Sequence, residues 1–437
     1  MSRGHVVRLV KTPANSLPTA VDKWWTQPVR SPSIDEGFPQ LITGSSMPFL
    51  GGSLAFERFS VSGFEVTEFG DEQIELLAQN VAGNNQTASA ENVHIGFLGG
   101  AHLFDQEFEL SKNVLDEAVH FSIRIDTNQI PSAIRKAWLQ MELLALAKDS
   151  PSGVVSKAGR KEAKEAVEQR CEVEAASGKY RKMQQFPLLW DHTRETLYFG
   201  GTAGTASGHC ADLLERVFNV ELRHISAGSI AQAWAIENDL YGEVDDLVPA
   251  NFVPAVPHGD LAWTNQHSKA PDFLGNEFLL WLWWKLENDS DTFTLPDNSE
   301  VTVMLTKTLS LECPLGESGK ETISHESPIK LPEAMHAIRS GKLPRKSGMT
   351  VIRDGQQFDL VLQAETFGIS GAKIHVDEDA DFEVDERIDA IRTLSETIDL
   401  MFHSFCAKRV SDTWNKDLKS IIHWLENAGA KAERSAA

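Results

Sequence analysis

The segment that most constrains the fold is residues 272–287, DFLGNEFLLWLWWKLE, the densest apolar stretch of the chain. Its apolar side chains point around most of a helix, so the pattern predicts a helix that is buried on several sides. Three tryptophans within four positions would also suit a platform on which nucleic-acid bases stack. Their neighbours are leucine and phenylalanine rather than lysine and arginine, which favours core packing.

The composition is that of a soluble globular protein, with 41% apolar and 24% charged residues. The chain has no run of about 18 uncharged apolar residues, so we expect no membrane span. The first residues lack the apolar core of a secretory signal. The four cysteines lie far apart without a CxxC motif, which argues against a zinc site and fits a reducing cytoplasm.

Strand and helix patterns alternate along the 437 residues, which is long enough for two or three domains. We expect an α+β fold with mixed antiparallel sheets and packed helices. The strand patterns include residues 53–66, 103–108, 119–126 and 300–311, and a hairpin that turns at Asp354–Gly355. The predicted regions are a flexible N-terminal extension (1–45), an N-terminal α+β region (46–150), a central region with a basic helix and a hairpin (151–265), and a C-terminal α+β region with the Trp-rich helix and a long amphipathic helix (266–437).

Two further helices are predicted from apolar stripes at helical spacing. The first covers residues 127–148, and we expect its stripe to be core rather than a ligand site: Ile134, Trp138, Met141, Leu144 and Ala145. The second helix begins in the acidic run 377–389. We interpret this run as a solvated face rather than a metal site. Its expected inner stripe is Ile388, Ile391, Leu394, Ile398, Met401, Phe402 and Phe405.

The most cationic part of this acidic chain is residues 157–182. It holds eight Lys or Arg and five Glu, a surplus of three positive charges in a chain of formal net charge -22. Three of the cations stand within residues 179–182, around Tyr180 and directly after a Ser-Gly turn. A local surplus of this kind indicates contact with an anion. A second basic segment, residues 340–347, is predicted to be a turn.

The alternative for the helical part of this region is a solvated surface stabilised by charge pairs one turn apart. Lys161 with Glu165, and Lys164 with Glu168, have the required i,i+4 spacing. Under this interpretation the helix itself would contact no ligand, and the cations of residues 179–182 would remain the candidate site.

No catalytic motif is present. The chain lacks a GxSxG elbow, an HExxH pair and a P-loop, and the glycine-rich residues 200–208 lack the Gly-Lys-Ser/Thr ending that a P-loop needs. We therefore predict a protein that is not an enzyme and uses no cofactor or metal ion. Two alternatives stay open. One is a metal-dependent nuclease built from scattered carboxylates, and the other is a protein-interaction module that does not bind nucleic acid.

Several segments together resemble a known family. In chain order they are IRIDTNQIPSAIRKAWLQMEL, RKEAKEAVEQR, GKYRKMQQFPLLWD, ADLLERVF and DFLGNEFLLWLWWKLE. Their order and spacing are similar to the recombination-associated protein RdgC family in its longer form, from about residue 53 to about residue 409. The chain departs from the compact form of the family in its extension before residue 46 and in an insertion around residues 240–271.

The resemblance implies a function. RdgC-like proteins bind DNA, mainly duplex, with little sequence preference. They form ring-shaped homodimers with a basic hole and an acidic exterior, limit the loading of a RecA-type recombinase and have no known enzymatic activity. A cytoplasmic, nucleoid-associated protein that does not bind membranes is therefore expected.

The resemblance also implies where DNA would be contacted. The basic-aromatic turn of the family corresponds to residues 179–182, with Tyr180 at a place often held by Phe. A second, loosely matched basic loop would fall near residues 320–342. Together with the charged helix, the expected DNA contacts are Lys157, Arg160, Lys161, Lys164, Lys179, Tyr180, Arg181, Lys182, Lys320, Lys342, Arg345 and Lys346.

Overall fold

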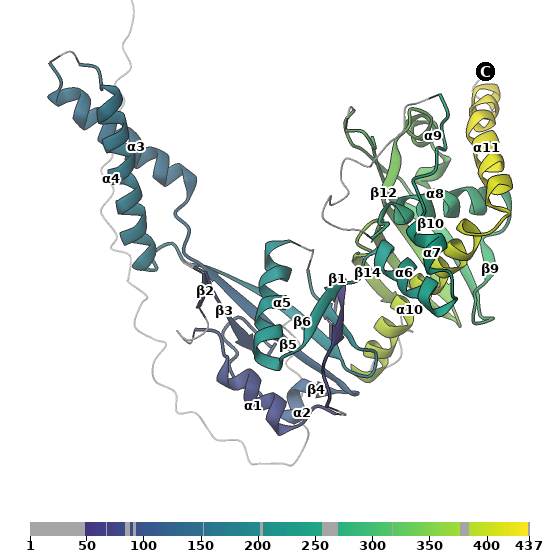
Figure 1. Cartoon of the computed structure of the whole chain (residues 1–437), viewed down its shortest axis with the longest axis horizontal. Coiled ribbons are helices and arrows are strands. Elements are labelled where there is room, and N and C mark those ends of the chain that lie inside the picture. The colour runs from purple at the N-terminus through teal and green to yellow at the C-terminus, as the bar shows by residue number, and fades with distance from the viewer. Residues whose placement is uncertain are drawn as a thin grey trace, which may run out of the picture. The chain divides into compact units, whose positions relative to one another are not determined.

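The computed structural model describes residues 49–435 except 67, 84–87, 91–92, 152, 202–203, 256–269, 317 and 376–383. Residues Ser45–Ala437 make up a single unit. The predicted N-terminal extension and most of the acidic run lie outside the described residues. Among those described, eleven α-helices accompany fourteen strands paired in antiparallel ladders, which confirms the α+β class (Figure 1). The division of residues 46–437 into three regions stays a prediction.

Strand β1 (Leu54–Ser62) joins two half-sheets. Its first residues pair with β14, where Phe56 lies opposite Ile369, and its later residues pair with β7 and β8. The C-terminal half-sheet consists of β14 (Ile369–His375), β13 (Gln356–Gln363), β12 (Leu343–Arg353), β10 (Glu300–Glu312), β11 (Glu321–Ser324) and β9 (Thr292–Thr294). The N-terminal half-sheet consists of β7 (Thr196–Phe199), β8 (Glu221–His224), β6 (Lys182–Asp191), β5 (Ala118–Thr127), β4 (Val114–Leu115), β3 (Val93–Leu98) and β2 (Ala88–Ala90).

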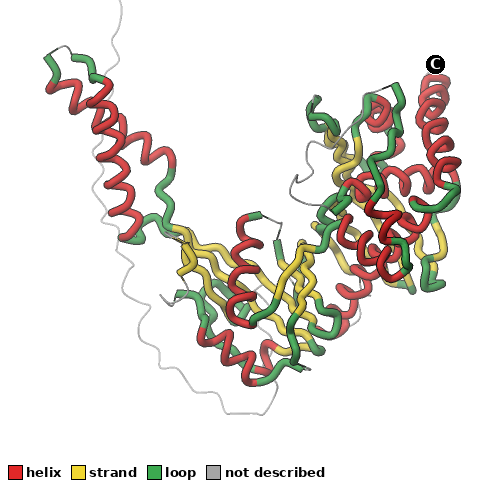
Figure 2. The backbone as a smooth tube through the Cα atoms, viewed as in Figure 1, coloured by secondary structure: helices red, strands yellow, loops and turns green. Residues whose placement is uncertain are grey.

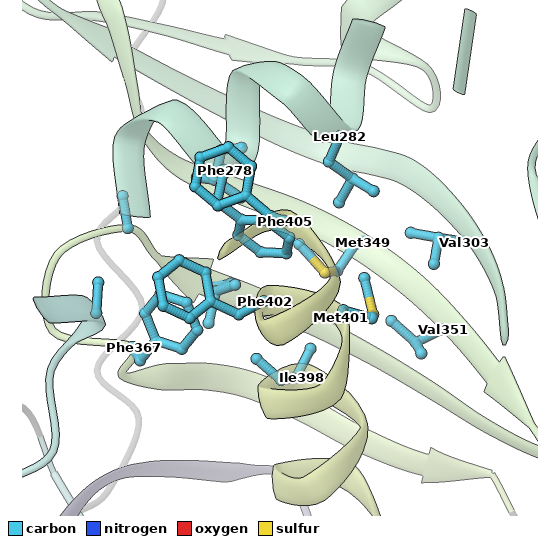
Figure 3. Close-up of a cluster of buried hydrophobic side chains, with 14 of the residues drawn as sticks. Phe278, Leu282, Val303, Met349, Val351, Phe367, Ile398, Met401, Phe402 and Phe405 are labelled. Carbon is cyan, nitrogen blue, oxygen red and sulfur yellow. The ribbon is translucent and has the colours of Figure 1, made fainter. Parts of the chain in front are cut away.

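The larger core belongs to the C-terminal half-sheet and its helices. These helices are α6 (Ala227–Glu237), α7 (Tyr241–Asp245), α8 (Phe273–Asn288), α9 (Pro332–Arg339), α10 (Val384–Arg409) and α11 (Trp414–Ser435), with a short 3-10 turn at Pro328–Lys330. Figure 3 shows Phe278 of α8 meeting Phe402 of α10, with ring centroids 5.4 Å apart. Every residue of α8 from Phe273 to Trp283 is buried, which confirms the predicted buried helix.

Gly275 explains how α8 comes so close to the sheet. A Cβ atom at this position would lie 1.8 Å from the carbonyl oxygen of Ala364, so only glycine allows this approach. The predicted inner stripe of α10 is also confirmed, because all seven apolar residues predicted for that stripe are buried.

A smaller core lies on the N-terminal half-sheet, beneath α1 (Asp71–Gln79) and α5 (Thr205–Phe218). The helix α2 (Leu110–Asn113) precedes β4. Strand β1 contributes Leu54 and Phe56 to the larger core and Phe59 and Val61 to the smaller one. The two cores therefore share strand β1, which contributes apolar side chains to each of them.

A helical hairpin is inserted between β5 and β6. It consists of α3 (Ser132–Asp149) and α4 (Lys157–Ala176), and it follows the last pair of the β5–β6 ladder, Thr127 opposite Lys182. Figure 2 shows the two helices side by side. The prediction that the α3 stripe is core is wrong for much of its length: Trp138 is 8% exposed, but Met141 is 60% and Leu144 63% exposed. A two-helix hairpin covers only one side of each helix, so the rest of the stripe stays uncovered.

Two predicted segments differ in the structure. Residues 103–108 form a turn and coil rather than a strand, because the Asp105 carboxylate accepts hydrogen bonds from the backbone N–H groups of Ala101 and Glu107. Residues 340–347 are only in part a turn, since β12 begins at Leu343 and pairs with β10 and β13. Among the described residues, no helix combines the length and apolar character needed to cross a membrane.

Candidate nucleic-acid interface

The turn after α4 has a defined backbone. The helix ends at Ala176, and Gly178 adopts φ +71°, a conformation that favours glycine. The backbone N–H of Arg181 donates to the carbonyl oxygen of Gly178 at 3.1 Å, and β6 begins at Lys182. The cations of this turn are therefore held between a helix end and a strand start.

Tyr180 anchors the turn against α3. Its half-buried ring meets Trp138 edge to face, with centroids 6.5 Å apart and planes at 72°. The guanidinium of Arg170 lies over the Trp138 ring at 4.4 Å, and the ammonium of Lys179 lies 5.4 Å from the centre of the Tyr180 ring. This packing holds the turn against α3.

The cations of the turn differ in their partners. Arg181 and Lys182 are exposed, and neither forms an ion pair with any described residue. Lys179 lies 3.4 Å from Glu174, and its hydrogen bond to this carboxylate raises the pKa of Lys179. Arg181 and Lys182 are thus the two cations most available to an external anion.

Helix α4 presents four more exposed cations: Lys157, Arg160, Lys161 and Lys164. The predicted pair of Lys161 with Glu165 is present at 3.4 Å. The other predicted pair is not, because Glu168 accepts hydrogen bonds from Arg135 of α3 instead. Lys164 is left without an ion-pair partner in the described part of the chain.

The second predicted region has a different environment. Lys342 is 7% exposed and is bound to Glu321 of β11. Arg345 lies 2.9 Å from Glu312 and 2.5 Å from Glu365. Both cations are neutralised by carboxylates of β10, β11 and the turn after β13, which favours a structural role for them.

The two remaining residues of the second region are less constrained. Lys320 is exposed and Lys346 is half-buried, and neither has an ion-pair partner among the described residues. The structure thus places Lys157, Arg160, Lys161 and Lys164 in the first turns of α4 and Lys179–Lys182 after its other end. It commits Lys342 and Arg345 to ion pairs in the C-terminal half.

Sequence reasoning missed Arg170 as a member of the site. It is one of the eight cations of residues 157–182, and its contact with Trp138 brings it beside Tyr180. The sequence places Trp138 on one predicted helix and Arg170 on the next. Whether these two side chains meet depends on how the helices pack.

The described residues hold no group of three or more His, Cys, Asp or Glu side chains placed to bind a metal ion. In comparisons with known proteins, no protein-family model and no curated protein matches this chain.

Proposed function

We propose that this protein binds DNA, mainly duplex, without sequence preference through the turn after α4 and the exposed cations along that helix. The observation that carries the proposal is the exposure of Arg181 and Lys182 without an ion-pair partner among the described residues, in a chain of formal net charge -22. Duplex DNA carries a negative charge every ~1.7 Å of its axis, so a few clustered cations are enough for non-specific binding. The acidic remainder of the chain would repel DNA from other surfaces.

The resemblance to RdgC-like proteins supports a specific role for this binding. A protein that covers duplex DNA without sequence preference would limit the loading of a RecA-type recombinase, act in the nucleoid and need no enzymatic activity. Lys320 and Lys346 remain proposed secondary contacts, whereas the ion pairs of Lys342 and Arg345 favour a structural contribution from these two residues.

We also propose that the protein acts as a homodimer, of the ring form that the resemblance implies. The helical insertion exposes apolar side chains on both of its helices: Met141 at 60%, Leu144 at 63% and Val173 at 68%. Exposed apolar groups gathered on one element are typical of an interaction surface. A two-fold dimer through this hairpin would place the cations of both subunits beside one seam and double each contact with DNA.

The test is DNA affinity measured against salt concentration. For Arg181→Ala/Lys182→Ala, we expect the negative slope of log K against log salt to become shallower by about 0.9 for every DNA phosphate that the variant no longer neutralises. The control is Lys330→Ala/Lys373→Ala, which removes two exposed lysines that also lack an ion-pair partner in the described residues. A slope that is unchanged in the first variant, or reduced equally in the control, would exclude this turn as the binding surface.

A further inference from the structure

A groove between α8 and α11 combines aromatic side chains with cations. Its volume is about 720 Å³, and it is open to solvent on one side. Trp284, Glu287 and Asn288 line it from α8, and the α11 residues that line it follow one another at helical spacing from Lys416 to Asn427. Small-molecule sites in proteins commonly measure about 300–1,000 Å³, so the groove has the size of a ligand site.

One wall of the groove is fixed by the carboxylate of Glu287. It accepts the indole N–H of Trp283 at 2.9 Å and that of Trp424 at 3.0 Å. The Trp283 and Trp424 rings meet edge to face, with centroids 5.6 Å apart and planes at 78°. This one side chain therefore ties α11 to the buried helix α8. Of these two rings, Trp424 lines the groove and Trp283 is fully buried, so the Trp424 part of the wall is held in place before a ligand arrives.

The two lysines of the groove are unpaired among the described residues. Lys416 and Lys419 are exposed, lie one turn apart on α11 and form no ion pair with the described residues. Nearby lysines differ: Lys285 lies 2.6 Å from Asp289, and Lys408 lies 3.9 Å from Asp417. Among the described residues, the one carboxylate that lines the groove is that of Glu287, which accepts two indole N–H groups and keeps its negative charge. Two point charges thus face a solvent-filled space beside indole rings.

We propose that this groove binds a nucleotide, with its base against Trp284 and its phosphate at Lys416 and Lys419. Lysine is a compact donor that suits phosphate oxygens, and every base has a π face that can stack on an indole. A purely apolar ligand would leave both lysines without a partner, and a bare phosphate would leave the aromatic wall uncovered. A free nucleotide and the end of a single DNA strand share this chemistry. The site lies on other elements than the proposed duplex interface and extends the proposed function.

The test is binding of three probes to the full chain by titration calorimetry: deoxyadenosine monophosphate, deoxyribose 5-phosphate and a short oligodeoxyadenylate. We expect the sugar phosphate to bind at least about tenfold more weakly than the nucleotide, because it cannot stack. We expect Lys416→Ala/Lys419→Ala to weaken nucleotide binding at least about tenfold, and Trp284→Leu to weaken it by a similar factor. The matched control, Lys330→Ala/Lys373→Ala, keeps the wild-type affinity.

The outcomes separate the two sources of the ligand. Equal affinity for the mononucleotide and the oligomer identifies a free nucleotide, and tighter binding of the oligomer identifies a strand end. Absence of binding by the wild type, equal affinity for the sugar phosphate, or wild-type affinity in the lysine variant would overturn the proposal. Arg181→Ala/Lys182→Ala is expected to retain nucleotide binding, so that the duplex proposal and this one fail or succeed separately. Urea unfolding of Trp284→Leu shows whether that variant is folded, and the lysine variant does not depend on it.

Discussion

Two basic segments of this chain look alike in sequence and differ in their surroundings. In the segment after α4, Arg181 and Lys182 are exposed and unpaired within the described residues, on a two-helix insertion that covers only one side of each helix. In the segment that opens β12, Lys342 and Arg345 are bound to Glu321, Glu312 and Glu365 on neighbouring parts of the C-terminal half-sheet. A cluster of lysine and arginine therefore indicates a binding surface only where the fold leaves its charges uncompensated.

The largest expected effect is on stability, in the β12 segment. Arg345→Ala leaves the carboxylate of Glu365, which is 8% exposed, without its cation. Breaking such a partly buried pair lowers the free energy of unfolding by about 3 kcal/mol. Urea denaturation measures this loss, and Arg181→Ala serves as the matched control, with a change of less than about 0.5 kcal/mol. Equal losses in the two variants would remove the distinction between the two segments.

The next effect concerns self-association of the helical insertion. Met141→Asp/Leu144→Asp places charges on side chains that are already 60% and 63% exposed, so the monomer should keep its stability. We expect the dimer dissociation constant to rise at least about tenfold, because a charge would be buried at the seam. Sedimentation velocity over a concentration series measures it, and Met304→Asp, at an exposed methionine of β10, is the control. Wild-type association in the double variant would rule out this face as the seam.

The smallest effect concerns the positioning of the cations. Tyr180→Ala removes the edge-to-face contact with Trp138 and frees the turn, whereas Tyr180→Phe keeps the contact. An aromatic pair contributes about 0.5–1.5 kcal/mol, so we expect Tyr180→Ala to weaken DNA binding about twofold to tenfold and Tyr180→Phe to leave it unchanged. Fluorescence anisotropy with labelled duplex measures both. A loss in Tyr180→Phe would instead assign a direct contact to the phenolic hydroxyl.

Hydrophobic spacing and turn residues in the sequence predicted the elements whose burial or geometry depends on a short local segment. The burial of α8, the inner stripe of α10 and the hairpin at Asp354–Gly355 are all confirmed. Helix α6 was missed because its buried residues surround most of the helix and give little helical periodicity. A local signal was nevertheless present, since Ser226 accepts the backbone N–H of Ser229 in a capping box.

The sequence by itself determined that α8 is buried, which stripe of α10 faces inward, and that residues 157–182 carry a positive surplus in an acidic chain. Only the tertiary structure decided which of these charges are free and which apolar stripes are covered. The physical reason is that both properties depend on neighbours distant in sequence. Arg345 donates to Glu312, 33 residues away in sequence. Arg135 donates to Glu168 across the same separation, so Glu168 does not pair with Lys164. Hydrophobic periodicity records the face that a helix can bury, but only packing determines how much of it is covered.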